Sequence, residues 1–184
     1  MKRIITVLVL LCVTVFAFAQ NPSLLRQRME IAQTEVEIDD IIETKLEVFY
    51  MDDESPRVYY LSLGNLGVGT DIVQINFDPV FELFIPLGGT LDAAIAKMEE
   101  IKDFYNEPRL ATTELTGCFA LAYPNDERVD VTVTRRQMVF TKILEFSLPT
   151  SSDGLVRATY VSRGNFRSLA GGVKFYKALH PKEL

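Results

Sequence analysis

Few side chains in this sequence are suited to nucleophilic or metal chemistry. Its 184 residues include two cysteines and one histidine. Cys118 alternates with small residues in a strand-like pattern, so we interpret it as a small buried apolar side chain. A serine or cysteine nucleophile needs a base, and the one histidine, His180, lies close to the C-terminus; the serine-hydrolase motif G-x-S-x-G does not occur. The sequence therefore predicts no catalytic residue, no cofactor and no metal site of the ordinary zinc type.

Carboxylates are the remaining source of chemistry. Asp52-Asp53-Glu54 and Asn125-Asp126-Glu127 offer oxygen ligands for calcium, but neither run has the spacing of an EF-hand loop, and both favour polar turns. Asp39-Asp40 with Glu43 is interpreted as a solvated edge. A small hydrolase that uses a carboxylate pair stays open as an alternative, and a cleft with two acids, one of raised pKa, would favour it.

The stretch PLGGTLDAAIAKMEE, residues 86–100, has the order of a phosphate cradle: an apolar strand, a glycine loop and a helix. No lysine follows Gly88 and Gly89, so the P-loop pattern is missing. Asp92 lies in the first helical turn, where its carboxylate complements the helix dipole and repels phosphate. We therefore interpret the glycines as a turn and Thr90 as the helix N-cap.

Four tyrosines are the candidate ligand contacts. Aromatic rings on a sheet can stack on a ligand, although ordinary packing on the sheet faces explains most such rings. The candidates are Tyr59, Tyr60, Tyr123 and Tyr160.

The N-terminal stretch MKRIITVLVLLCVTVFAFAQ has the layout of a secretory signal peptide. A basic end is followed by an apolar run and a small-x-small site that ends at Ala19. We expect cleavage between Ala19 and Gln20, which removes residues 1–19. The style of the signal is bacterial, so we expect an exported protein in the periplasm or outside the cell.

Cleavage would change the cysteine count and the charge. It would remove Cys12, so Cys118 would stand alone and no internal disulfide could form. The net charge of the chain is −6, and loss of Lys2 and Arg3 gives 17 − 25 = −8. This acidic balance disfavours nucleic acid and anionic lipid as partners, and Arg135-Arg136 form no large basic patch. No later segment is apolar and long enough to span a membrane.

Hydrophobic periodicity predicts the elements that would position these residues. An apolar stripe from Leu91 to Tyr105 predicts a helix over residues 90–105. We expect residues 20–35 to be a mobile or helical leader. Residues 166–179 are ambiguous, with a strand favoured after Gly171-Gly172. Alternating patterns predict strands at 36–50, 57–63, 72–77, 80–85, 115–123, 129–133, 137–148 and 155–162.

These elements predict one α+β domain over residues 20–184. Short strands joined by tight turns favour a curved antiparallel sheet of about six to nine strands, with one main helix packed on it. The small side chains Cys118, Ala120 and Ala122 favour that face for the helix. The function we expect is an exported, non-catalytic module that binds a protein, a peptide or a small apolar ligand. The alternatives are the carboxylate hydrolase and a carrier that holds an apolar ligand between sheet and helix.

Overall fold

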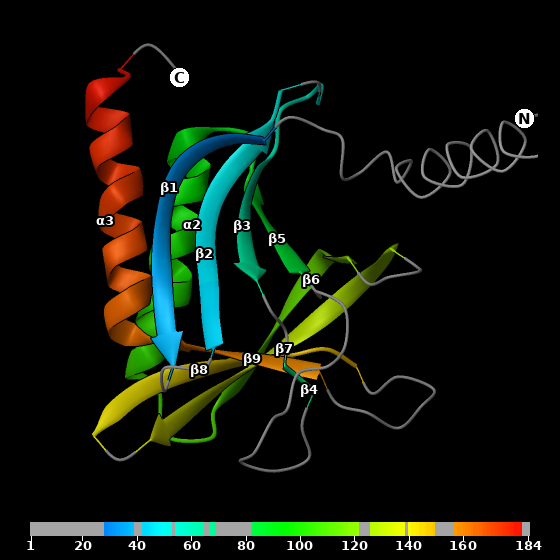
Figure 1. The fold of residues 1–184 in the computed structure, drawn as a ribbon, viewed down its shortest axis with the longest axis vertical. Helices are drawn as coiled ribbons and strands as arrows, with labels where there is room; N and C mark the ends of the chain where they lie inside the picture. The colour runs from blue at the N-terminus through cyan, green and yellow to red at the C-terminus, as the bar shows by residue number, and fades with distance from the viewer. Residues whose placement is uncertain are drawn as a thin grey trace, which may run out of the picture.

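The computed structural model describes residues 28–38, 42–52, 54–64, 67–68, 82–121, 126–138, 140–149 and 157–181. The cleavage site at Ala19 and Gln20, the expected strand 72–77 and Tyr123 lie outside the described residues. Within them, the chain forms one antiparallel sheet and two α-helices (Figure 1). The elements are β1 (Arg28–Ile38), β2 (Ile42–Met51), β3 (Tyr59–Gly64), β4 (Gly67–Val68), β5 (Glu82–Gly88), α2 (Leu91–Asp103), the 3-10 turn η2 (Phe104–Asn106), β6 (Thr112–Leu121), β7 (Asp126–Met138), β8 (Thr141–Ser147), β9 (Arg157–Ser162) and α3 (Arg163–Leu179).

The sheet is an antiparallel meander that curves around the helices. Its described strands follow the order β1-β2-β3-β5-β6-β7-β8-β9-β4, so most neighbours in the sheet are neighbours in the chain. Helix α3 contacts β1 and β2 near one end of this order, and also β8 and β9 near the other. Because one helix reaches both ends, the sheet must bend around it, as Figure 1 shows. The predicted α+β class with a curved antiparallel sheet is confirmed.

Helix α2 begins where the glycine turn predicts. The Thr90 hydroxyl accepts a hydrogen bond from the Ala93 amide at 3.2 Å, which satisfies one of the free amides of the first turn. Gly88 has φ +126°, and a Cβ built there would lie 2.8 Å from the Cβ of Ala93. The glycine is therefore required by both the backbone and the close approach of the helix.

The expected strand after Gly171-Gly172 is wrong, because residues 163–179 form helix α3. Ser162 caps this helix, and its hydroxyl accepts a hydrogen bond from the Asn165 amide at 3.1 Å. A Cβ on Gly172 would lie 3.0 Å from the Cβ of Ala32 in β1. The glycine lets the helix approach the sheet, and the burial of that face outweighs a helix propensity cost of about 1 kcal/mol. The buried side chains of α3 are Phe166, Leu169, Ala170 and Val173.

The leader expected over residues 20–35 is also corrected, in its described part. Residues 28–35 belong to β1, which pairs with β2 from Arg28↔Met51 to Ile38↔Ile42. A register irregularity between Glu30 and Ala32 shifts the alternation of faces. Met29 and Ala32 therefore have the three-residue spacing of a helix, although both lie in a strand.

A hairpin turn divides the strand expected over 137–148. Strand β7 ends at Met138 and β8 begins at Thr141, and these two residues pair. Phe140 therefore lies at the turn and does not share a face with Leu144 and Phe146, which are buried. The turn contains no Gly, Pro, Asn or Asp, the residues that mark most turns in a sequence.

A second irregularity changes which face Leu115 occupies. The pairing of β6 with β7 shifts between Leu115 and Cys118, and Gly117 has φ +70°. This bulge places Leu115 in the same buried cluster as Cys118 rather than beside Phe119. The helix-side cluster includes Cys118, which agrees with the expected face for the helix.

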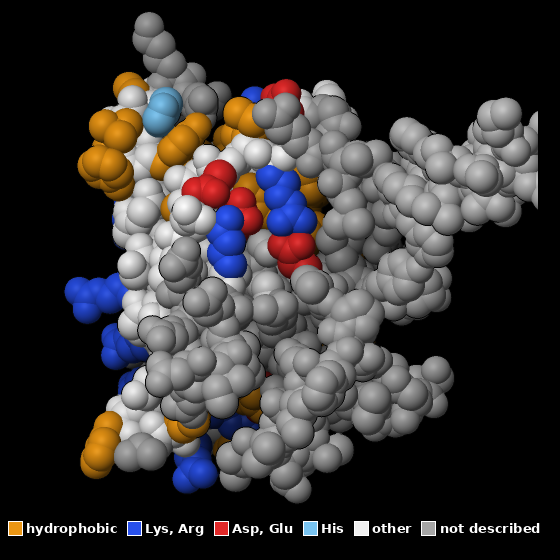
Figure 2. All heavy atoms as spheres, in the orientation of Figure 1, with side chains coloured by type: hydrophobic (Ala, Val, Ile, Leu, Met, Phe, Trp, Pro, Cys, Tyr) orange, Lys and Arg blue, Asp and Glu red, His pale blue; other side chains and the backbone are white. Residues whose placement is uncertain are grey.

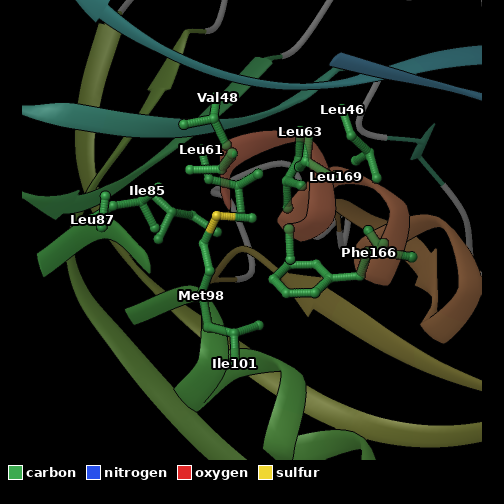
Figure 3. Packing of buried hydrophobic residues seen from close by; sticks show 14 of the residues in the cluster. Leu46, Val48, Leu61, Leu63, Ile85, Leu87, Met98, Ile101, Phe166 and Leu169 are labelled. Carbon is green, nitrogen blue, oxygen red and sulfur yellow. The ribbon is translucent and has the colours of Figure 1, made fainter. Parts of the chain in front are cut away.

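The main core fills the space between the sheet and the helices. Figure 3 shows Met98 and Ile101 of α2 and Phe166 and Leu169 of α3 directed toward the apolar side chains of the strands. The strand residues labelled there are Leu46, Val48, Leu61, Leu63, Ile85 and Leu87. A smaller cluster of Phe49, Met51 and Phe84 lies on the opposite face of the sheet, because alternate residues of a strand point to opposite faces.

Candidate functional site

The three predicted tyrosine contacts that the structure describes do not form one site. Tyr59 is 2% exposed and packs edge-on against Tyr50 in the helix-side core, at 5.6 Å between ring centroids. Tyr60 lies on the opposite face, stacks on Phe49 and donates to Glu54 Oε1 at 2.8 Å. Tyr160 is partly exposed on β9, near the other end of the sheet. Tyr59 and Tyr60 are thus packed on the faces of the sheet, which is the ordinary role of such rings.

The thiol and the imidazole lie in unrelated environments. Cys118 is fully buried, and burial followed by the charge of Asp130 raises its pKa to about 11. Such a thiol is neutral at physiological pH and is a poor nucleophile. His180 is exposed at the end of α3, where its ring stacks on Tyr176 at 4.2 Å.

No group of three or more His, Cys, Asp or Glu side chains in the described ranges is arranged to hold a metal ion. Of the two acidic runs considered for calcium, Glu54 accepts the Tyr60 hydroxyl instead. Within the same ranges, no helix has the length and apolar character needed to cross a membrane.

Two carboxylates meet on the sheet face that is turned away from the helices. The Arg28 guanidinium donates to both oxygens of Glu82 at 2.8 Å, and Ser62 donates to the same carboxylate. Glu47 Oε2 lies 3.8 Å from Arg28 Nη1 and 3.5 Å from Lys45 Nζ. Burial raises the pKa of Glu47, against the opposing effects of Lys45 and Arg28. Figure 2 views this face, where acidic and basic side chains lie together near the centre.

This network resembles a stabilising ion cluster more than a reactive pair. Both oxygens of Glu82 are engaged by Arg28, and a bidentate pair of this kind is strong and geometrically specific. The guanidinium also lies 5.0 Å from the ring centroids of Phe49 and Phe84, so it is held between two rings. A general acid must reach a substrate proton, and Glu47 is only 6% exposed.

A second ion pair lies on the same face, at the other end of the sheet. Arg136 donates from Nε and Nη2 to the two oxygens of Glu145 at 2.9 and 3.0 Å, and Ser147 donates to the same carboxylate at 3.1 Å. Burial and the nearby Glu145 charge raise the pKa of Tyr160. The pair fixes the register of β7 and β8 close to their hairpin turn.

The β7–β8 turn carries the most exposed large apolar side chains of the described sheet. Phe140 is 95% exposed, Met138 59% and Leu110 56%. Leu110 belongs to the segment before β6, and its amide donates to the carbonyl of Arg135 in β7 at 2.8 Å. Figure 2 shows an exposed apolar side chain at the lower left, where Figure 1 places this hairpin, and a larger apolar group at the upper left, at the C-terminal part of α3.

Cationic residues adjoin these apolar residues in the sequence or in the strand pairing. Arg109 adjoins Leu110, Lys142 follows the turn, and Arg163 follows Ser162, which pairs with Ile143. We call this group the hairpin end. It comprises Arg109, Leu110, Arg135, Arg136, Met138, Phe140, Lys142 and Arg163.

Arg135 is the most unusual member of the hairpin end. Arg135 is paired with Leu144, and Leu144 is paired with Val161. Paired residues share a face, so Arg135 lies on the helix side of the sheet, and it is only 7% exposed. Its Nη2 donates to Gln137 Oε1 at 3.0 Å, and its buried Nε has no hydrogen-bond partner. It forms no ion pair with any described carboxylate. A buried cation without a counter-charge is costly and adds a local positive field.

The acidic side chains close to the hairpin end do not cancel its charge. Glu145 is bound by Arg136, and Glu107 is exposed beside the segment that holds Arg109. The hairpin end thus has five cationic residues, one of which is paired with Glu145, in a chain whose net charge is −6. The hairpin end is locally positive.

The sequence pattern by itself does not predict this surface. The signal was present in RRQMVFTK, residues 135–142, which combines basic and apolar residues without an acid. The alternation of apolar and polar residues continues through this segment, so the pattern predicts a strand and hides the turn. Arg109 and Arg163 are far away in the sequence, and only the pairing of the strands brings them to the same end. A comparison of this chain with protein-family models, curated proteins and solved structures finds no significant match.

Proposed function

We propose that this protein is an exported, non-catalytic binding module and that the hairpin end is its interaction surface. The proposal of export comes from the layout of residues 1–20, in which a basic end and an apolar run precede Ala19. The binding role comes from the hairpin end.

The exposure of Phe140 is the observation that carries this proposal. A phenylalanine side chain gains about 1.5–3 kcal/mol when it leaves water, yet 95% of this one remains accessible. Met138 and Leu110 add apolar surface at the same end. Apolar side chains grouped in this way, with a polar surround, are typical of interaction sites.

The two alternative functions have weaker support. For a carboxylate hydrolase, the acids that meet are Glu47 and Glu82, and the second is already bound by Arg28 and Ser62. For a carrier of an apolar ligand, the space between sheet and helices is occupied by the side chains of the main core (Figure 3). Neither arrangement offers a substrate or a ligand a place among the described residues.

Site-specific photo-cross-linking in the cells of origin tests the proposal. A photoreactive residue replaces Phe140 in one variant, and in a control it replaces Glu114, which is exposed on β6. We expect a defined adduct with protein or lipid at position 140 and none at position 114. Equal labelling at both positions, or none at 140, would contradict the proposed surface.

A further inference from the structure

We infer that the hairpin end docks on an anionic lipid surface. This inference rests on the proposed function and names the partner class. It follows from the shape, the apolar content and the charge of the hairpin end.

The shape of the surface favours a bilayer over a folded partner. The β7–β8 hairpin projects at one corner of the molecule (Figure 1). Phe140 at its turn is almost fully accessible, so no groove formed by described side chains encloses it. A convex tip of this kind needs a matching hollow on a protein partner, whereas a bilayer interface deforms around an inserted side chain. Aromatic side chains are favoured at the headgroup level.

The charge around the tip fits an anionic surface. Lys142 and Arg163 are not in ion pairs with any described residue, and neither is Arg109. The charged groups of long basic side chains can stay at the lipid phosphates while their aliphatic parts enter the bilayer beside an inserted apolar side chain. Buried Arg135 strengthens the positive field at the same end.

The rest of the molecule would orient the protein on the membrane. The net charge of −6 repels an anionic surface over most approaches. The carboxylates of Glu47 and Glu82 lie on strands of the other half of the sheet order. Among the described residues, the C-terminal part of α3 also exposes Phe175 and Leu179, but its Lys174 and Lys177 are paired with Glu99 and Asp92. We therefore expect the hairpin end to be the bound face, with strong salt dependence.

The test uses protein isolated from its cells of origin and two kinds of vesicle. One kind is pure phosphatidylcholine, and the other replaces about a third of it with phosphatidylglycerol. Co-sedimentation is measured for the parent protein, Phe140→Ser, Lys142→Glu and the control Phe175→Ser. Phe175 is also exposed, but it lies in the C-terminal half of α3. All three changes are at exposed or partly exposed positions, so folding should not be affected.

We expect binding only to the anionic vesicles and its loss at high salt. Phe140→Ser should weaken binding at least about tenfold. Lys142→Glu should weaken it at least about fivefold, which is the factor for one lost cation at an anionic surface. Phe175→Ser should bind as the parent does.

Three results would overturn the inference: no vesicle binding, equal binding to both lipid compositions, or equal weakening by Phe175→Ser. The cross-linking experiment separates this failure from failure of the proposed function. A protein adduct at position 140 without vesicle binding would leave the interaction surface in place and reject lipid as its partner. Neither adduct nor vesicle binding would reject both.

Discussion

Tyr105→Phe tests how the helices are fastened to the end of the sheet. Tyr105 lies in η2, directly after α2, and is fully buried. Its hydroxyl donates to the carbonyl of Val161 at 3.0 Å, with a longer contact to the Ser162 carbonyl at 3.3 Å. These carbonyls belong to the junction of β9 and α3, so one hydroxyl joins the end of α2 to the start of α3.

The expected loss follows from what the substitution removes and retains. Phenylalanine keeps the ring, which packs against Phe166 at 6.0 Å, so no large cavity forms. The lost hydrogen bond is buried and leaves a carbonyl without this donor. We expect the free energy of unfolding to fall by about 1–2 kcal/mol. For a chain of this size, that corresponds to a decrease in Tm of about 2–8 °C.

Urea unfolding followed by far-UV circular dichroism measures the effect, since the chain contains no tryptophan. Tyr59→Phe is the matched control. Tyr59 is also buried in the helix-side core, but its hydroxyl makes no hydrogen bond to a described residue. We expect the control to change stability by less than about 0.5 kcal/mol. If the two variants lose equal stability, or Tyr105→Phe loses less than about 0.5 kcal/mol, the hydroxyl does not fasten the junction.

Three further predictions concern single residues. Gly88→Ala should destabilise the protein by about 1–3 kcal/mol in urea unfolding, because φ is +126° and the new Cβ meets Ala93, whereas Gly171→Ala, in open space on α3, should be neutral or stabilising. Glu47→Gln should be more stable than the parent at pH 7, and the difference should vanish below about pH 4. The fold raises the pKa of Glu47, so the contribution of Glu47 to stability is fully present when its carboxyl group is protonated. That contribution is lost as the pH rises through the raised pKa. A difference in stability between variant and parent that stays constant across pH would contradict this. Cys118 should react with a thiol reagent at neutral pH only in urea, and fast labelling of the native protein would show that the thiol is accessible.

Local signals were sufficient for the elements whose pattern and ends agree. The apolar stripe of α2, the cap at Thr90 and the glycine turn before it all lie within about fifteen residues, and the structure has the helix where they predict it. The alternation around Leu61 and around Leu144 likewise predicts strands that the structure contains. The coarse class, a curved antiparallel sheet with a helix packed on it, follows from such patterns because alternation and helical periodicity each bury one face.

The errors came from positions where distant contacts decide the local structure. Gly171-Gly172 weaken a helix, but Gly172 meets Ala32 across the core, and that close packing favours the helix. The turn after Met138 lacks turn residues, so the hairpin is determined by the pairing of β7 with β8 and by the Arg136–Glu145 ion pair.

The candidate site shows the same division more strongly. The composition indicates an acidic chain without an evident nucleophile or metal site, because those properties depend on residue types alone. The positive, apolar hairpin end depends on position. Antiparallel strands return the chain to the same end of the sheet, which brings together the segments of Arg109, Lys142 and Arg163. Phe140 is exposed because the turn directs it away from the core. Sheet register and burial are properties of the whole fold, so the place where charge and apolar surface meet was decided only in three dimensions.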